Sequence, residues 1–286
     1  MKKIKASHKA VSAPIDDLVT FRALPTNSIS MEDMNPFIFL NHHGPQTYPS
    51  NNNGLPFGPH PHRGMETVTF ILDGDIMHKD SSGNKSVITA GGIQWMTAGK
   101  GLIHAEVSSD EFKRNGGDLE ILQLWLNLPA KNKMDNPFYK GLQEEDIPIL
   151  KRDDDKVKIK LISGSLDNTE GAIKSVSNVF LSTIEFTEDS GLALTVPEHH
   201  VVFFYVVRGS LTVNETIVSA FHLAELTEEG NSVEIISNEK SYLIFGHAPK
   251  LNERIVAHGP FVLNSEEEIV QSYKDYQLGK FGSWND

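Results

Sequence analysis

Short apolar runs separated by polar turn residues predict β-strands along most of the chain. Two runs lie in the first half, at 66–72 and 120–128, and five lie in the second half, at 157–163, 179–186, 201–207, 233–236 and 242–245. Several of them alternate apolar and polar positions, as a strand with one buried face does. Turns such as Asp73-Gly74 and Arg208-Gly209 follow them. This density of short strands favours an all-β sandwich or barrel.

The two halves of the chain echo each other weakly, which indicates a duplicated fold. Residues 69–75 and 204–210 each form an apolar strand that closes on a polar–glycine turn. The segment 135–155 holds two prolines and two acidic runs, so we expect it to be the connector. The predicted domains are therefore two β-barrels, at residues 1–140 and 141–286.

Two further segments depart from the strand pattern. Residues 46–61 are rich in proline, asparagine and glycine, and we expect a long loop that leads into a pair of histidines. Near the other end, Ser265 to Glu268 form a capping box, and apolar residues follow at helical spacing. A short C-terminal helix that ends near Gly279 is therefore expected.

Composition narrows the classes of protein to which the chain can belong. The 286 residues contain no cysteine, which excludes disulfides, thiolate zinc sites, iron–sulfur clusters and cysteine nucleophiles. No signal peptide or membrane span is evident, so we expect a soluble cytoplasmic protein. The net charge of −12 falls entirely in residues 141–286, which hold 12 Lys/Arg and 24 Asp/Glu. This acidic half disfavours direct binding to nucleic acid or to an anionic membrane.

Two pairs of metal-competent side chains stand out: His60 with His62, and His104 with Glu106. Side chains at i and i+2 of a strand point to the same face, so two such strands would aim three imidazoles and one carboxylate at one point. A lone histidine is usually a surface or hydrogen-bonded residue, but this grouping predicts a mononuclear metal site in the first half. Without thiolates the donor set suits Fe(II), Mn(II), Co(II), Ni(II) or Cu(II), and zinc would also bind. Fe(II) is our first choice, with positions left open for a substrate.

Other ionisable residues have weaker claims. Glu66 lies four residues after His62 and is the alternative carboxylate ligand, ranked second because the intervening loop can shift the strand phase. We expect Arg63 to point away from the histidines and to form a salt bridge that supports the loop. The adjacent pairs His42-His43 and His199-His200 would face opposite ways in a strand. Because His247 also stands alone, the second half is predicted to be free of metal.

Candidate pocket residues lie on strands expected to point inward. Phe57, Gln94, Met96 and Gln123 are substrate-binding candidates, since a pocket for an aromatic ligand is lined by such residues. Ordinary core packing is the alternative interpretation. His78 and His258 are expected in turns.

Four motifs of the chain resemble the pirin family. His60–Thr69, Gln94–Glu106 and Leu122–Leu128 are similar to the pirin signature, and His258–Asn264 is similar to the family's C-terminal motif. The resemblance spans nearly the whole chain. It implies a bicupin, in which two jelly-roll-like barrels share one chain and only the N-terminal barrel binds metal.

The resemblance also implies a ligand set and an activity. His60, His62, His104 and Glu106 would hold iron, because the pirin pattern uses the glutamate of the second motif, whereas the general cupin pattern would use Glu66. Some pirins resemble quercetin 2,3-dioxygenases in activity and oxidise flavonols. Other members act as redox-responsive nuclear cofactors that bind transcription factors.

Three functions follow from these observations. The first is a dioxygenase in which Glu106 deprotonates a flavonol-like substrate beside the metal, before reaction with dioxygen. The alternative is a non-enzymatic redox or metal sensor, whose change of site charge alters binding to a protein partner. The third is a relic barrel with a structural metal. We expect a monomer in each case.

Overall fold

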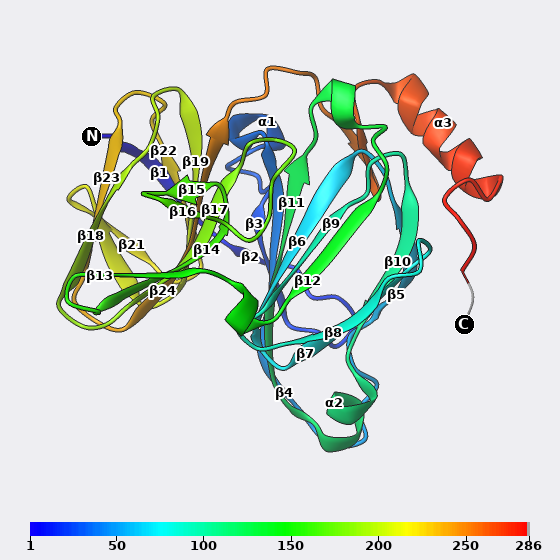
Figure 1. Cartoon of the computed structure of the whole chain (residues 1–286), viewed down its shortest axis with the longest axis horizontal. Helices are drawn as coiled ribbons and strands as arrows, with labels where there is room; N and C mark the ends of the chain where they lie inside the picture. The colour runs from blue at the N-terminus through cyan, green and yellow to red at the C-terminus, as the bar shows by residue number, and fades with distance from the viewer. Residues whose placement is uncertain (285–286) are drawn as a thin grey trace. The chain divides into compact units, whose positions relative to one another are not determined.

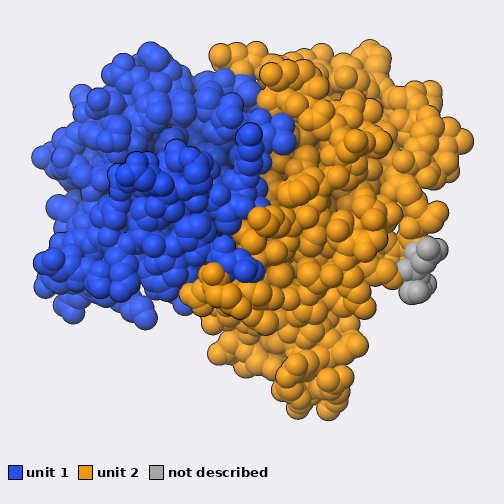
Figure 2. All heavy atoms as spheres, in the orientation of Figure 1, with its two compact units in different colours: residues 1–11, 23–36, 146–251 blue, residues 12–22, 37–145, 252–286 orange. Residues whose placement is uncertain are grey.

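The computed structural model describes residues 1–284 and divides the chain into two compact units (Figure 1). Residues 12–22, 37–145 and 252–286 form the unit that we call the N-unit. Residues 1–11, 23–36 and 146–251 form the C-unit. Figure 2 shows the two units in different colours.

The N-unit is built from two β-sheets. The order of the seven-stranded sheet is β12 (Phe138–Leu142), β9 (Ile93–Thr97), β6 (Met65–Asp73), β11 (Gly117–Asn127), β4 (Phe37–Tyr48), β3 (Thr20–Leu24) and β2 (Val11–Ser12). The order of the four-stranded sheet is β5 (Phe57–His62), β10 (Leu102–Val107), β7 (Asp75–Asp80) and β8 (Lys85–Thr89). Ile71 and Ile121 from the first sheet pack with Ile76 and Ile88 from the second, so apolar side chains of both sheets fill the interior between them.

Short elements complete the N-unit. A two-stranded sheet pairs β25 (Val256–His258) with β26 (Phe261–Leu263). The helices are α2 (Asp110–Asn115), α3 (Glu266–Gln277) and a 3₁₀ turn at Ala130–Asn132, and a second 3₁₀ turn at Glu144–Asp146 ends at the border with the C-unit.

The C-unit repeats this two-sheet plan. Its seven-stranded sheet has the order β1 (Ile4–Lys9), β22 (His222–Leu226), β19 (His200–Arg208), β24 (Ser241–Pro249), β17 (Phe180–Phe186), β14 (Val157–Ser163) and β13 (Ile149–Arg152). Its four-stranded sheet has the order β18 (Ser190–Thr195), β23 (Ser232–Ser237), β20 (Ser210–Val213) and β21 (Thr216–Ser219). The small pair β15 (Ser165–Leu166) and β16 (Thr169–Glu170) and the helix α1 (Met31–Met34) complete it.

Strand order demonstrates the duplication that the sequence indicated. The run β9-β6-β11-β4 of the N-unit corresponds to β22-β19-β24-β17 of the C-unit, and β5-β10-β7-β8 corresponds to β18-β23-β20-β21. Every strand from β4 to β11 thus has a counterpart thirteen places later in chain order. The turns at Gly74 and Gly209 occupy equivalent places, and both glycines adopt positive φ, which residues with a side chain rarely do.

The all-β prediction and the predicted C-terminal helix are both confirmed. Helix α3 begins after Ser265, whose hydroxyl accepts from the Glu268 N–H while the Glu268 carboxylate accepts from the Ser265 N–H. Its apolar Ile269 is buried against Phe261 and Leu263. No helix among residues 1–284 is long and apolar enough to cross a membrane.

Two segments differ from the sequence-based expectation. The expected loop at 46–61 is shorter, because β4 continues to Tyr48 and β5 already begins at Phe57. The expected connector at 135–155 contains β12 and β13, which pair with β9 and β14 respectively. Apolar periodicity is weak in such short edge strands, and their identity depends on the partner strand.

The division into units also differs from a simple boundary between residues 140 and 141. The long stretch of the N-unit ends at Glu145 and the long stretch of the C-unit begins at Asp146. However, β1 belongs to the C-unit, and residues from 252 onward belong to the N-unit. Strand β1 belongs to the C-unit because it pairs with β22. Such long-range pairing leaves no signal in local sequence patterns.

Candidate metal centre

The two predicted ligand pairs lie on neighbouring strands of the N-unit. Strand β5 carries His60 and His62, and β10 carries His104 and Glu106. The strands pair antiparallel with His104 directly opposite His60, and the register shifts between His104 and Glu106. Directly opposed residues of an antiparallel pair have neighbouring side chains, so this register places His104 next to His60, whereas Glu106 lies opposite Phe57.

The three imidazoles form a compact cluster. The ligand nitrogens of His60, His62 and His104 all lie within 4.8 Å of one another. The Nε2 atoms of His60 and His104 are 2.9 Å apart. Adjacent ligands at about 2.1 Å from an octahedral ion would be about 3.0 Å apart, so this spacing fits one shared ion.

Hydrogen bonds fix which nitrogen of two imidazoles is free to bind a metal. Nδ1 of His60 donates to the Gly58 carbonyl at 2.7 Å, and Nδ1 of His62 donates to the Pro260 carbonyl at 3.2 Å. Because a carbonyl oxygen only accepts, Nδ1 carries the proton and Nε2 keeps its lone pair in the neutral ring. In metalloproteins, backbone carbonyls that accept from the other ring nitrogen hold metal-binding histidines in this way.

Burial keeps two of the imidazoles neutral. Desolvation, with a smaller effect of nearby His60, lowers the pKa of His62 to about 3. Desolvation likewise lowers the pKa of His104 well below its usual value. His60 is only half-buried and forms the solvent-facing member of the cluster. Neutral imidazoles are the form that binds metal, so the site is ready for a cation near pH 7.

Glu106 lies beside the histidine cluster and is held by two donors. Thr69 Oγ1 donates to its Oε1 at 2.8 Å, and Gln123 Nε2 donates to its Oε2 at 2.6 Å. Trp125 Nε1 in turn donates to Gln123 Oε1 at 3.2 Å. The distance from Glu106 Oε2 to His104 Nε2 is 3.9 Å. The carboxylate thus lies beside the cluster, but among residues 1–284 only the three histidines form a group whose ligand atoms all lie within 4.8 Å of one another.

A fourth buried histidine extends this cluster and was missed by the sequence analysis. His78 lies on β7 directly opposite Glu106, and its ring is centred 5.4 Å from that of His104. Its Nε2 bonds to Asp80 Oδ2 at 3.1 Å, and it stacks on Tyr139 with centroids 3.8 Å apart. The prediction of a turn at His78 was therefore wrong. The i, i+2 spacing of His78 and Asp80 is the same signal that identified the ligand pairs.

Glu66 and Arg63 point away from the histidines. Glu66 Oε1 accepts from Trp95 Nε1 at 3.1 Å and from Thr97 Oγ1 at 2.6 Å, and burial raises the pKa of this carboxyl. Glu66 and Thr69 are three residues apart on β6 and so occupy opposite faces, and only Thr69 contacts Glu106. Arg63 forms the predicted salt bridge, with Nη1 2.9 Å from Asp275 Oδ2.

Comparison with protein families gives the chain an identity. Residues 18–126 match the Pirin family, and residues 181–282 match the Pirin C-terminal cupin domain. A Pseudomonas aeruginosa protein that is named, provisionally, as a quercetin 2,3-dioxygenase is 34% identical over 267 residues, which cover 93% of each chain. The chain belongs to the pirin family.

Solved structures agree with this assignment of the chain to the pirin family. The crystal structure of a quercetin 2,3-dioxygenase from Acinetobacter baumannii superposes with a TM-score of 0.92 at 33% identity, covering 99% of both chains. The bacterial pirin YhhW from Escherichia coli, in complex with nickel(II), superposes with a TM-score of 0.67 at 21% identity, covering 86% of this chain and 99% of its own. The bicupin fold is therefore established, and the second likeness bears on fold alone.

The C-unit of the pirin has apolar residues where the N-unit has its candidate ligands. In the N-unit His104 faces His60 and Glu106 faces His78; in the C-unit Val233 faces Leu194 and Ile235 faces Val213. By this register the counterparts of His60, His62, His104 and Glu106 are Leu194, Val196, Val233 and Ile235. All four counterparts are buried members of one hydrophobic cluster. Aliphatic side chains offer no metal donor, so packing replaces coordination there.

The residues that hold Glu106 are replaced in the same way. Thr69 and Gln123 are cross-strand partners in the N-unit, and Phe204 and Phe245 are the corresponding partners in the C-unit. The two phenylalanine rings pack edge to face with centroids 6.2 Å apart. One polar feature that the sequence did not reveal is the pair His200 and His247, whose Nδ1 atoms are 3.0 Å apart.

The predicted substrate residues are distributed around the interior of the N-unit. Gln123 donates a hydrogen bond to Glu106. On the strand β9, Gln94 lies opposite Thr69 of β6 and Met96 lies opposite Thr67, so the two side chains share one face of the sheet. Phe57 packs against the apolar core, with its ring centred 5.2 Å from that of His43. Their roles in binding stay predictions.

Arg22 is a cation near this interior that the sequence analysis missed. Its Nε donates to Asn41 Oδ1, and its guanidinium lies 4.2 Å from the centre of the Phe39 ring. Phe39 stacks on Trp125, whose ring is centred 5.2 Å from that of His62. Desolvation by burial lowers the pKa of Arg22. A single arginine in a β-strand gives no sequence signal that it will stack on an aromatic ring near the histidine cluster.

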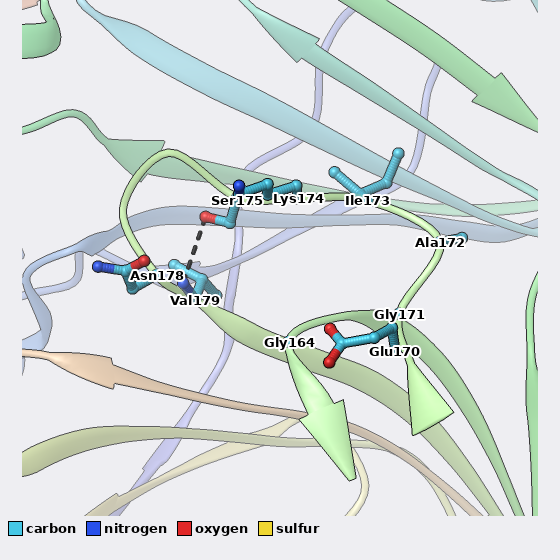
Figure 3. Close-up of a pocket in the computed structure, with 9 residues that line it drawn as sticks. All are labelled: Gly164, Glu170, Gly171, Ala172, Ile173, Lys174, Ser175, Asn178 and Val179. Carbon is cyan, nitrogen blue, oxygen red and sulfur yellow. Dashed lines mark hydrogen bonds between the residues drawn. The ribbon is translucent and has the colours of Figure 1, made fainter. Parts of the chain in front are cut away.

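A separate pocket lies in the C-unit (Figure 3). Its volume is about 510 Å³, and it is lined by Gly164, Glu170, Gly171, Ala172, Ile173, Lys174, Ser175, Asn178 and Val179. Within it the Val179 N–H donates to Ser175 Oγ at 3.2 Å. The lining offers one carboxylate and no histidine, so its donors do not make a metal site. The histidine cluster of the N-unit is therefore the stronger functional candidate.

Proposed function

We propose that this pirin is a metal-dependent dioxygenase that cleaves flavonols of the quercetin type. The observation that carries the proposal is the histidine cluster, in which the Nε2 atoms of His60 and His104 are 2.9 Å apart and Glu106 lies beside them. The 33% identity to a quercetin 2,3-dioxygenase over almost the whole chain supports the substrate class. The ligands would be His60, His62, His104 and Glu106, in the N-unit only, and the metal would be Fe(II).

The donor set fits such an ion. Three imidazoles and one carboxylate leave two positions of an octahedral ion for a bidentate substrate or dioxygen. A bound iron would supply the redox chemistry with dioxygen and would acidify a coordinated hydroxyl group. Cysteine ligands do not compete, because the chain has none.

The protein's own residues would prepare the substrate for oxidation. Glu106 would accept the proton of the substrate 3-hydroxyl as a general base. Thr69 and Gln123 hold its carboxylate from both oxygens, so the base need not reorganise during the step. Trp125 fixes Gln123 in turn. Arg22, a cation near the same interior face, favours an anionic ligand such as a flavonolate.

The test is the activity of purified, iron-loaded protein with quercetin and dioxygen. We expect carbon monoxide release and loss of the quercetin absorption band. His104→Gln should remove both the bound iron and the activity, while His199→Asn, an exposed control in the C-unit, should change neither. A fully iron-loaded protein that releases no carbon monoxide would contradict the proposal. The regulatory alternative would then be tested by comparing protein partners of the Fe(II) and Fe(III) forms.

A further inference from the structure

We propose that the C-terminal segment, residues 256–281, is a positioning element of the metal centre. It holds His62 and the loop that leads into His104, so that docking of this segment and binding of the metal strengthen each other. The inference rests on the metal-binding part of the proposed function and is independent of the substrate.

The first contact is with the ligand itself. The Pro260 carbonyl accepts from His62 Nδ1 at 3.2 Å and also from the Arg63 N–H at 3.4 Å. The Val262 N–H donates to the Arg63 carbonyl at 3.1 Å, and Arg63 and Phe261 form a parallel bridge. The segment therefore adds a short strand next to His62 and selects the tautomer of its ring.

Arg63, the residue after His62, ties the segment to the loop before His104. Its Nη1 donates to Asp275 Oδ2 at 2.9 Å and to Ser272 Oγ at 3.2 Å, both on α3. Its Nε donates to the Lys100 carbonyl at 2.7 Å, in the loop that leads into His104. The guanidinium also lies 4.5 Å from the centre of the Phe281 ring. One buried cation next to His62 thus links α3 to the loop before His104.

Steric fit shows how closely the segment is packed against these loops. A Cβ on Gly64, which follows Arg63, would lie 2.1 Å from the Val262 carbonyl oxygen. A Cβ on Gly101 would lie 2.7 Å from the Phe281 ring. Lys133 Nζ, itself buried, donates to the carbonyls of Gly64 and Val262, both at 2.9 Å. Any shift of the segment would therefore move the loops with it.

The energetic consequence follows from thermodynamic linkage. Loss of an outer partner of a metal ligand typically weakens metal affinity by about 10- to 100-fold. If the docked segment raises metal affinity, bound metal must stabilise the docked segment by the same factor. Asp275 is the best residue to change, because it contacts Arg63 and lies far along the chain from every candidate ligand.

The experiment measures Co(II) binding rather than turnover. Dissociation constants come from competition with a chromophoric chelator, and the visible spectrum of Co(II) reports ligand geometry. Asp275→Asn should weaken Co(II) binding by about 10-fold, the lower end of that range, because Asp275 acts on His62 through Arg63, and it should alter the spectrum. Glu266→Gln is the matched control on the same helix. It removes an exposed ion pair in which Glu266 Oε1 lies 3.8 Å from Arg254 Nη2. It should change the dissociation constant by less than about twofold.

Hydrogen exchange of the unsubstituted protein supplies a second measurement that needs no variant. Co(II) should slow exchange of the Val262 amide and of α3. Unchanged exchange on Co(II) binding, or unchanged affinity in Asp275→Asn, would overturn this inference alone. Failure of the unsubstituted protein to bind Co(II) would overturn the proposed metal centre as well.

Discussion

Single hydrogen bonds decide the chemistry available to each side chain of the centre. Glu66 and Glu106 are both buried carboxyl groups of the N-unit, yet their partners differ. Glu66 is bonded to Trp95 and Thr97, on the opposite face of β6 from Thr69. Glu106 is bonded by Thr69 and Gln123 beside the histidines. Even spacing suggested Glu66 as a partner of His62 and Glu106 as a partner of His104, but the turn at Gly64, with φ of +78°, changes the strand phase between His62 and Glu66.

This difference predicts the outcome of two matched substitutions. Glu106→Gln should lower kcat for quercetin by about 10²- to 10⁴-fold, because an amide cannot act as a general base. Glu66→Gln should lower kcat by less than about threefold, since an amide can still accept from Trp95 and Thr97. Steady-state kinetics with measured iron content would test both. A Glu66→Gln variant without iron would favour Glu66 as the ligand.

The paired histidines of the C-unit predict a dependence of stability on pH. Burial, with smaller effects of His200 and Lys2, lowers the pKa of His247 to about 3 from 6.5. Between these values the unfolded chain binds a proton that the folded chain does not, so this residue makes stability fall as pH falls from 6.5 to 3.

Replacement of His247 should therefore reduce acid sensitivity. His247→Phe keeps the ring stack on Phe180, where the centroids are 4.8 Å apart, and removes the titration. We expect the unfolding free energy of the C-unit to depend less steeply on pH between 4 and 6. Urea titrations at a series of pH values would measure this slope. The control His199→Asn, at an exposed position, should keep the slope of the unsubstituted protein.

At the scale of secondary structure, periodic elements were predicted well and short ones were not. The predicted runs at 66–72, 120–128 and 201–207 correspond to β6, β11 and β19, which are central strands with long buried faces. The edge strands β12 and β13 were expected to be connector. Central strands carry their apolar pattern in their own residues, whereas an edge strand is defined by hydrogen bonds to one neighbour.

Helix α3 was predicted from its capping box, and the same feature predicts a stability effect. Ser265→Ala removes the hydroxyl that accepts from the Glu268 N–H at 3.2 Å. The N-unit should lose about 1 kcal/mol of unfolding free energy, the usual contribution of such a cap. Urea unfolding would measure it, with Ser219→Ala on the exposed strand β21 as the control. A loss below about 0.3 kcal/mol would mean that tertiary contacts alone hold the helix.

For the whole molecule, duplication produced two units of one topology with different interiors. The N-unit keeps polar side chains at the positions where the C-unit has Leu194, Val196, Val233 and Ile235. Buried polar groups stabilise a fold only when they are bonded, whereas aliphatic packing stabilises it directly. Retaining three imidazoles in one interior therefore favours a functional explanation for the N-unit.

Two different interiors predict two different responses to metal. A ligand that binds only the folded N-unit stabilises that unit by about 2.7 kcal/mol at 100 times its dissociation constant. Calorimetry should resolve two transitions, and Fe(II) or Co(II) should raise only one of them. His104→Ala should abolish the shift. A metal-induced shift of both transitions would contradict a metal centre confined to the N-unit.

The sequence by itself determined the strand-rich class, the family resemblance and the candidate ligands, because each depends on residues close together in the chain. The i, i+2 spacing needs only the alternation of a single strand. Tertiary structure decided the rest: the register that places His104 opposite His60, the donors to Glu106, and the return of the C-terminal segment to His62. These features join residues up to about 200 positions apart, and such contacts depend on the packing of the whole unit.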